Sequence, residues 1–208
     1  GEVYNYLKLK KKFNIKTKTN SDTELILELF SKLGPKTFSL LEGMFAIAIY
    51  DKQNNKLFIA RDEFGIKPLY YFIDRNKFIF SSEIKTFFKL NIKREINPRS
   101  LSSYLTSEYY ENKTHTYFKN ILKLESGSYM EINNGRVKTK SYFDFYEYSK
   151  KIFVPKKYNE RKERLNEIIS KCVKNGMVSD VPISIAASGG LDSSILQYEA
   201  YKINQNAK

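Results

Sequence analysis

A glycine- and serine-rich segment near the end of the sequence has the composition of an anion-binding loop. It reads ISIAASGGLDSSI, from Ile183 to Ile195, and places two glycines and three serines directly after an apolar run. A strand that turns into a helix exposes backbone N–H groups at the helix N-terminus, where the helix dipole also favours an anion. Gly189 and Gly190 permit positive φ and close approach of the backbone. The pattern predicts a phosphate-binding loop; the alternative is a plain strand-to-helix turn.

This segment differs from the Walker A loop, which requires G-x-x-x-x-G-K followed by Ser or Thr. Ser188, Ser193 and Ser194 would add hydroxyl donors around the same concavity. Asp192 is unfavourable beside a phosphate, so we expect it either to cap the helix or to act through a Mg²⁺ ion placed between carboxylate and phosphate.

The remaining residues with reactive side chains are few, because the sequence holds one cysteine, Cys172, and one histidine, His115. One cysteine excludes an intramolecular disulfide framework and is typical of a reducing compartment, so we expect a cytoplasmic protein. One Cys and one His do not supply the ligands of a zinc site. Cys172 lies beside Val173 in an amphipathic segment, which favours a small core residue over a nucleophile.

The composition excludes some classes of protein. Hydrophobic residues make up 41% of the 208 residues, enough for a packed core, and no apolar run reaches the length of a transmembrane helix. No apolar stretch of a signal peptide follows the first basic residues. Because the chain does not begin with Met, we expect a fragment or a processed chain. The net charge of +13 is scattered, with clusters only at 8–12 and 150–157. No nucleic-acid-binding module accompanies it, so this role is not favoured.

The elements that must position these residues begin with a sheet. Four short runs rich in Ile, Phe and Tyr are separated by polar turns too short for parallel crossovers, and they predict an antiparallel meander. The first run is apolar at nearly every position, so we expect it to be covered on both faces. The four runs span residues 43–51, 56–62, 68–74 and 77–82.

Helices flank this sheet, which predicts an α+β sandwich. Residues 21–34 begin with a capping box of Ser21 and Glu24 and end at Gly34, and their leucines form one apolar face. Two further short helices are expected at residues 82–90 and 97–110, the second with a proline at its first position.

The chain divides into two parts. Strands return over residues 121–143, with a hairpin turn at 133–135, and the sequence loses its periodicity at 146–157. We therefore expect a first domain over residues 1–145, a linker over 146–157 and a second domain over 158–208. The second domain would contain a helix at 161–174, a strand at 180–187 and a helix from Ser193 or Ser194 onward.

Several motifs of the sequence resemble those of a known family, the glutamine-dependent asparagine synthetases. The loop S-G-G-L-D-S after a buried strand resembles the pyrophosphate-binding loop of the ATP pyrophosphatase fold, and VSDVPISIAASGGLDSSI resembles the start of the synthetase domain. Segments that resemble the family's N-terminal glutaminase domain and the stretch joining the two domains occur in order: GEVYNY, SDTELIL, LEGMFAIAIYD, ARDEFGIKPLYYF, FSSEIKTF, INPRSLSSYL and LESGSYMEI.

The resemblance implies a fold and a glutamine site. The family's glutaminase domain is a four-layer αββα sandwich of the N-terminal-nucleophile type, here incomplete at its N-terminus, in which an N-terminal Cys attacks the glutamine amide. Gly1 would offer its N–H to the oxyanion, Glu2 would lie at the amino-acid head of glutamine, and Asp22 would pair with the α-ammonium. Without the resemblance, Asp22 reads as an ordinary first-turn carboxylate. The cluster of Arg61, Asp62, Lys67 and Pro68 is interpreted as structural.

The resemblance also implies that the second part begins an α/β synthetase domain that binds ATP and aspartate. In the family the aspartate carboxylate attacks the α-phosphate of ATP, and ammonia from glutamine displaces AMP. Asp192 would act through Mg²⁺, and the pyrophosphate would be held by Ser188, Gly189, Gly190, Leu191 and Ser193. Ala187, where the family often has a bulkier apolar residue, would offer its backbone near the nucleotide.

Two departures from the family pattern matter. No Cys lies near the N-terminus, since the chain enters the pattern at the glycine of an N-G-E segment, and the synthetase domain stops after its first strand and helix. We therefore expect an inactive fragment of a larger, homodimeric amidotransferase ligase. The alternatives are a relative that forms an adenylate on a different carboxylate, as β-lactam synthetases do, and a non-catalytic remnant or binding protein.

Overall fold

The computed structural model describes residues 1–75, 77–107, 114–179 and 182–205. The chain forms two compact units, Gly1–Tyr146 and Glu147–Lys208. The first unit contains the three β-sheets of the described residues, the smallest of which is a two-stranded one. No helix in these residues is long and apolar enough to cross a membrane.

The centre of the first unit is a four-stranded antiparallel sheet in the order β3-β4-β8-β9. Its strands are β3 (Ala46–Asp51), β4 (Lys56–Arg61), β8 (Ser128–Asn133) and β9 (Arg136–Ser141). The turn expected between β8 and β9 is confirmed: Asn134 and Gly135 have φ of 47° and 74°, as both central residues of a two-residue hairpin of the favoured twist require.

A second antiparallel sheet has the order β6-β5-β7. It contains β5 (Tyr70–Ile73), β6 (Phe78–Ser81) and the short β7 (Leu122–Lys123). The expected single meander is therefore wrong, because β4 pairs with β8, far along the chain, and not with β5. The loop between β4 and β5 carries the chain from one sheet to the other.

The expectation that the first apolar run is covered on both faces is also wrong. That run is divided into β2 (Gly43–Met44) and β3, and β3 is an edge strand in which only Ile49 is buried. The interior strand β4 is instead enclosed on both faces: Phe58 and Ala60 join one core cluster and Ile59 joins the other.

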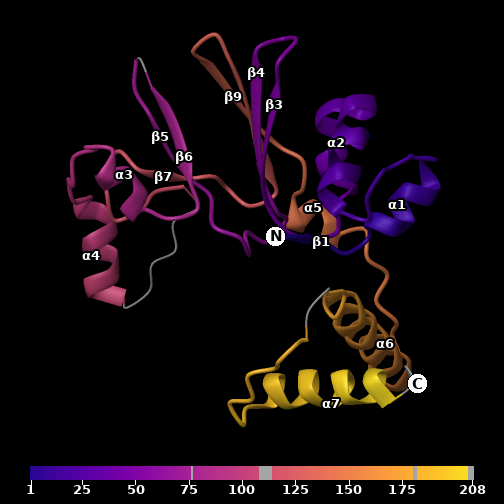
Figure 1. Ribbon diagram of the computed structural model, residues 1–208. Coiled ribbons are helices and arrows are strands. Elements are labelled where there is room, and N and C mark those ends of the chain that lie inside the picture. Colours follow the sequence, from indigo (N-terminus) through magenta and orange to yellow (C-terminus); the bar gives the residue numbers. More distant parts are fainter. Residues whose placement is uncertain (76, 108–113, 180–181, 206–208) are drawn as a thin grey trace. The chain divides into compact units, whose positions relative to one another are not determined.

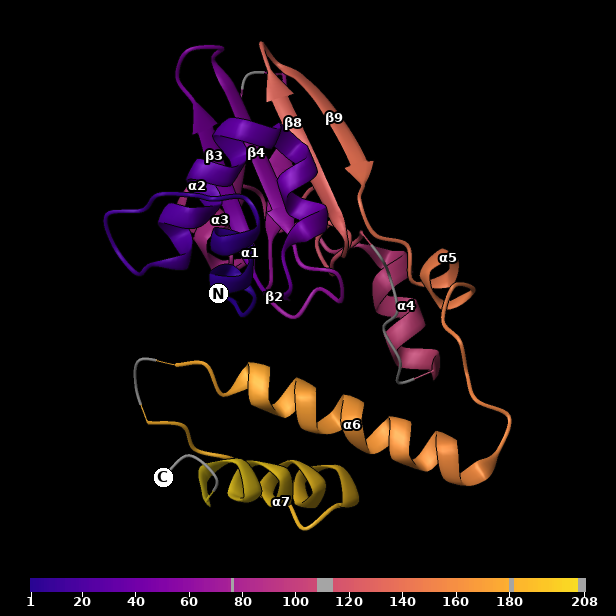
Figure 2. The same cartoon turned by 90° about the vertical axis from the view of Figure 1, so that its right-hand side faces the viewer.

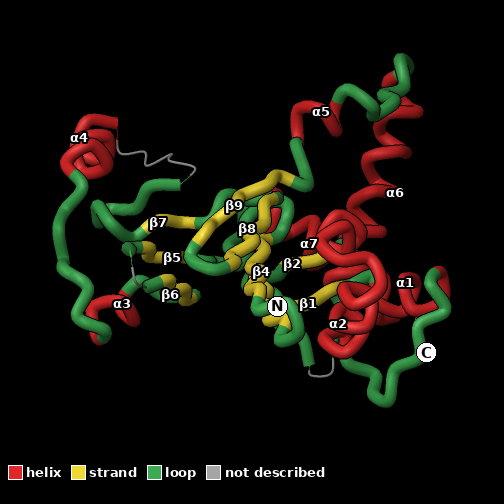
Figure 3. Tube along the Cα trace, turned by 90° about the horizontal axis from the view of Figure 1, so that it is seen from above, coloured by secondary structure: helices red, strands yellow, loops and turns green. Residues whose placement is uncertain are grey.

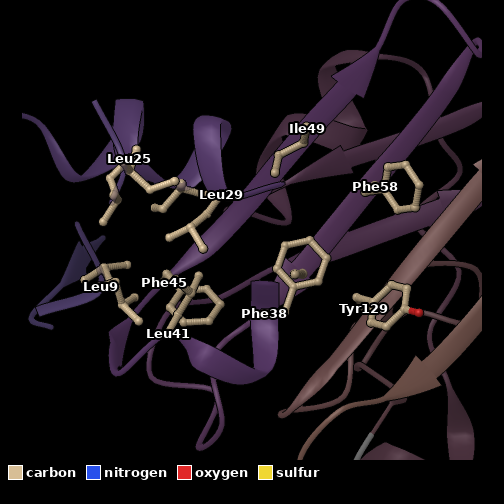
Figure 4. Close-up of a cluster of buried hydrophobic side chains, with 13 residues drawn as sticks. Leu9, Leu25, Leu29, Phe38, Leu41, Phe45, Ile49, Phe58 and Tyr129 are labelled. Atoms are coloured by element: carbon tan, nitrogen blue, oxygen red, sulfur yellow. The ribbon is translucent and has the colours of Figure 1, made fainter. Parts of the chain in front are cut away.

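Helices and sheets form layers around these two clusters (Figures 1 and 3). On one side of the four-stranded sheet lie α1 (Tyr6–Lys12), α2 (Asp22–Leu33) and the 3₁₀ helix η1 (Gly34–Leu40). The larger cluster fills this space, as Figure 4 shows for Leu25, Leu29, Phe38 and Phe58. The smaller cluster lies between the two sheets, and α3 (Lys85–Lys89) and α4 (Pro98–Ser107) lie beyond the second sheet. The layer order is αββα.

The second unit consists mainly of two helices, α6 (Tyr158–Gly176) and α7 (Leu191–Gln205), which lie side by side (Figure 2). The hydroxyl of Ser170 on α6 donates to the carboxylate of Glu199 on α7. This hydrogen bond, followed by one from Lys202, lowers the pKa of Glu199. A short helix, α5 (Phe145–Ser149), precedes them and begins one residue before the segment expected as a linker.

Three expectations for this unit are wrong. Residues 182–187 are not a strand, and 180–181 lie outside the described residues. A strand requires a neighbouring strand for its backbone groups, and the described part of this unit has none. The helix α7 begins at Leu191, before Ser193. Cys172 is exposed, not a core residue, because α6 buries none of its side chains.

Candidate functional site

A pocket of about 290 Å³ in the first unit lies where β1 (Glu2–Val3), the start of α2 and the edge strand β3 meet. It brings together all three residues expected to contact glutamine, Gly1, Glu2 and Asp22, although about 20 positions separate the last from the first two. The rest of its lining is mostly apolar: Val3, Thr23, Ile26, Leu27, Phe45, Ala46, Ile47, Ala48 and Ile49.

Sequence reasoning did not identify these other lining residues. The signal for Thr23 was its place next to Asp22 in the first turn of α2. The signal for the β3 residues was that they belong to the same apolar run as Gly43. Gly43 pairs with Val3 of β1, so the run lies beside β1. Nothing in the local pattern distinguished the pocket side of this edge strand from its other side.

Ser21, and not Asp22, caps the start of α2. Ser21 is the N-cap, and its Oγ accepts a hydrogen bond from the N–H of Thr23 at 3.2 Å. The predicted capping box is wrong in its second half, because Glu24 does not reach back to Ser21. Its carboxylate instead accepts the N–H groups of Lys18 and Thr19, each at 2.7 Å. The hydroxyl of Thr19, followed by these N–H groups, lowers the pKa of Glu24.

Asp22 links the helix to the first strand. Its Oδ2 accepts a hydrogen bond from the backbone N–H of Val3 at 3.0 Å, while Oδ1 accepts one from the hydroxyl of Thr23 at 3.3 Å. An ordinary first-turn carboxylate would interact only with its own helix. Asp22 therefore fixes the distance between the start of α2 and the backbone that carries Gly1 and Glu2.

The backbone at Gly1 and Glu2 is held by very close packing against β2. The two strands are antiparallel, with Glu2 opposite Met44 and Val3 opposite Gly43. A Cβ atom at Gly43 would lie 2.2 Å from the carbonyl oxygen of Glu2, and one at Gly1 would lie 2.7 Å from that of Met44. Only glycine permits this approach at either position.

Several carboxylates lie near β1 although the chain has a net charge of +13. Burial raises the pKa of the Tyr4 phenol, and the charges of Glu2 and Asp62 raise it further. Burial likewise raises the pKa of Glu63, and Glu42 and Asp62 add to the effect. A ligand with a cationic group is favoured in such a field.

The Arg61–Asp62 cluster is structural, as interpreted from the sequence. Asp62 is fully buried, and its carboxylate accepts four backbone N–H groups, from Phe45, Phe64, Ile66 and Lys67, at 2.8–3.3 Å. The guanidinium of Arg61 donates to three backbone carbonyls, those of Gly65, Lys67 and Leu124, at 2.6–2.8 Å. The cluster holds the loop between the two sheets and, through Phe45, one wall of the pocket.

The glycine-rich loop of the second unit is exposed, and its serine hydroxyls form hydrogen bonds within the loop. Ser188 Oγ and Ser193 Oγ are 3.1 Å apart, and the hydroxyls of Ser193 and Ser194 donate to the carbonyl of Gly190 at 3.1 and 2.8 Å. Gly189 has φ of 80°, and nothing lies within 4 Å of the position of a Cβ. Asp192 lies in the first turn of α7. Among the described residues, no group of three or more Asp, Glu, His or Cys is placed to hold a metal ion.

Comparison with known proteins identifies both parts of the chain. The family model described as a glutamine amidotransferase domain matches residues 1–143, and the one described as asparagine synthase matches residues 164–207. A protein of Methanocaldococcus jannaschii, provisionally named glutamine-hydrolyzing asparagine synthetase 2, is 39% identical over 93% of this chain. Glutamine-hydrolyzing asparagine synthetase 2 of Bacillus subtilis is 36% identical over 96% of the chain. The chain spans 38% and 28% of the lengths of these two relatives.

Among solved structures, one described as the allosteric regulatory enzyme of purine biosynthesis matches 95% of this chain and 41% of its own chain, with a TM-score of 0.50 and 17% identity. That likeness concerns the fold alone. Together with the layer order and the amidotransferase match, it confirms the expected N-terminal-nucleophile type of fold. The chain therefore belongs to the glutamine-hydrolysing asparagine synthetase family, with a glutamine amidotransferase domain over residues 1–143 and a segment that matches asparagine synthase over residues 164–207.

Proposed function

We propose that this chain is the glutamine-binding part, and the beginning of the synthetase part, of an ATP-dependent asparagine synthetase. The single observation that carries the proposal is the convergence of Gly1, Glu2 and Asp22 on one pocket in a chain whose two family matches follow each other in this order. In this proposal residues 1–145 belong to the glutaminase domain, residues 158–208 begin the synthetase domain, and residues 146–157 connect them.

Each residue of the pocket has a role that its chemistry suits. The carboxylates of Glu2 and Asp22 would bind the α-ammonium of glutamine through charge-assisted hydrogen bonds, which are the strongest kind available to it. The N–H of Gly1 would donate to the oxyanion that forms when the side-chain amide is attacked. The attacking group in the family is an N-terminal Cys, whose free α-amino group activates the thiol; Cys172 lies within α6 of the other unit and has no free α-amino group.

The loop from Ala187 to Ser193 would hold the pyrophosphate part of ATP. Its donor set fits an anion, because the N-terminal N–H groups of the 15-residue helix α7 and three serine hydroxyls lie at one exposed turn. Asp192 is the one carboxylate in this turn. It would therefore coordinate Mg²⁺ only if phosphate oxygens supplied further ligands. ATP would supply the adenylate that activates the aspartate carboxylate, and ammonia derived from glutamine would displace AMP to give asparagine.

The full protein would act on glutamine, aspartate and ATP in the cytoplasm, as a homodimer. The family implies these properties, and the low cysteine content of this chain is consistent with a reducing compartment.

The test is a titration of the 208-residue chain with L-glutamine, followed by two-dimensional NMR of the backbone amides. We expect chemical-shift changes at Glu2, Val3, Asp22 and Thr23. Asp22→Asn removes the charge that faces the α-ammonium and is expected to weaken binding roughly 10- to 150-fold, since a hydrogen bond to a charged group contributes roughly 1.5–3 kcal/mol.

The matched control is Asp74→Asn, the same change of charge at an exposed turn between β5 and β6. An asparagine oxygen can still accept the N–H of Lys77 there, so the fold and glutamine binding should be unchanged. Absence of any shift in the wild-type chain at millimolar L-glutamine would contradict the proposed site.

A further inference from the structure

Asn5 occupies a position whose usual role it does not perform. It is the N-cap residue of α1, and its carbonyl accepts the N–H of Leu9 at 3.0 Å. Asparagine at an N-cap normally uses its side-chain oxygen to accept an N–H group of the first turn. Here the side chain makes no such bond, and the residue is 9% exposed. Its amide is directed elsewhere in the fold.

Both ends of the Asn5 amide bind the segment that leads into β2. Nδ2 donates to the carbonyl of Leu40 at 2.9 Å, and Oδ1 accepts the N–H of Glu42 at 3.1 Å. The side-chain amide thus supplies both a donor and an acceptor to one backbone segment, as a neighbouring strand would. Only an amide side chain fits, because an aspartate cannot donate to Leu40 and a leucine can do neither.

The Asn5 side chain therefore extends a very short pair of strands. The next bond in the series runs from the N–H of Tyr4 to the carbonyl of Glu42 at 2.8 Å, and the pairs Val3–Gly43 and Glu2–Met44 follow. A two-residue strand pair has little stability alone. Asp22 ties Val3 of β1 to α2, and Asn5, two residues later, ties the chain to the segment before β2.

We propose that Asn5 is a positioning residue for glutamine, which holds the Gly1–Glu2 backbone against β2 so that the Gly1 N–H and the Glu2 carboxylate face the pocket. This role rests on the proposed function of the pocket. Asn5 is not among the residues that line the pocket, so its effect on a ligand is transmitted through β1.

The experiment compares Asn5→Asp and Asn5→Leu with the wild-type chain. Asn91→Asp, at an exposed position, is the matched control for the change of charge. Amide hydrogen exchange is measured at Val3 and Tyr4, which report on β1, and at Ile59 and Ala60 in β4, which report on the unit as a whole. L-Glutamine binding is titrated in the same samples.

We expect exchange at Val3 and Tyr4 to become about tenfold faster in both Asn5 variants, because each leaves a buried backbone group without a partner. The dissociation constant for L-glutamine should rise about tenfold, while β4 keeps its protection and Asn91→Asp behaves as wild type. If one of the two Asn5 variants does not fold, the other is used for the same measurements.

Three results would overturn the proposal. Unchanged exchange at Val3 and Tyr4 would show that Asn5 does not hold β1. Equal acceleration in β4 would show a general contribution to stability without a positioning role. Local opening of β1 with unchanged glutamine affinity would show that the pocket does not depend on it. If the wild-type chain binds no glutamine, the proposed function fails and the positioning of a ligand fails with it, whereas the exchange data still decide whether Asn5 holds β1.

Discussion

The buried carboxylate of Asp62 offers the sharpest test of how the pocket wall is held. It has no exposed surface, and four backbone N–H groups donate to its two oxygens. Phe64 and Ile66 donate to Oδ1 at 3.2 and 2.8 Å, and Lys67 and Phe45 donate to Oδ2 at 2.9 and 3.3 Å. The site has no place for a hydrogen-bond donor.

Asp62→Asn keeps the shape of the side chain and replaces one oxygen with an NH₂ group. In either orientation of the amide, two backbone N–H groups lose their acceptor and face a donor. Each buried group left unsatisfied costs roughly 1–3 kcal/mol, and removal of a buried charge recovers part of this loss. We therefore expect the free energy of unfolding of the first unit to fall by about 3 kcal/mol.

Urea denaturation followed by the near-ultraviolet circular dichroism of the tyrosines measures this change, and hydrogen exchange of β4 amides assigns it to the first unit. Asp74→Asn is the control, and it should change stability by less than about 0.5 kcal/mol, as surface substitutions usually do. A loss below about 1 kcal/mol in Asp62→Asn would refute the reasoning that these four hydrogen bonds hold the loop.

Three further predictions concern single features of the first unit and its chemistry. Gly43→Ala places a Cβ 2.2 Å from the Glu2 carbonyl, so β1 must move, and we expect L-glutamine binding to be lost while β4 amides stay protected from exchange; retained binding would contradict this. Gly135→Ala meets no atom within 4 Å and has only the strain of a φ of +74°, so urea denaturation should show a loss of about 1 kcal/mol and no effect on binding. The 208-residue chain should release no ammonia from L-glutamine above a buffer control, because Cys172 is its one cysteine and lies outside the first unit; turnover well above the control would show another nucleophile.

Short-range features of the fold were predictable from the sequence. The helix α2 follows from Ser21 before an apolar face and Gly34 after it, and the β8–β9 hairpin follows from Asn134 and Gly135. In each case the signal depends on a few adjacent residues whose backbone preferences do not require the rest of the chain. The structural nature of Arg61 and Asp62 was also correctly interpreted.

Long-range pairing was not predictable in the same way. The strand β4 has the same apolar appearance whether it pairs with β5 or with β8, and the apolar run at 43–51 looks like an interior strand although β3 is at an edge. Glu24 has the right spacing for a capping box, and a competing pair of N–H groups in the preceding loop binds it instead. Residues 182–187 have the composition of a strand but no neighbour to pair with among the described residues of their unit.

The candidate site shows the same division. The sequence by itself determined which residue types are present for chemistry: the glycine and carboxylate at Gly1 and Glu2, the carboxylate of Asp22, and the serine and glycine loop at 188–193. Only the tertiary structure decided that Asp22 contacts Val3 across 19 positions and that Asn5 binds Leu40 and Glu42 across more than 30. The physical reason is that a hydrogen bond between distant residues depends on the packing of whole layers, and the local preferences of the residues that form it do not encode that packing.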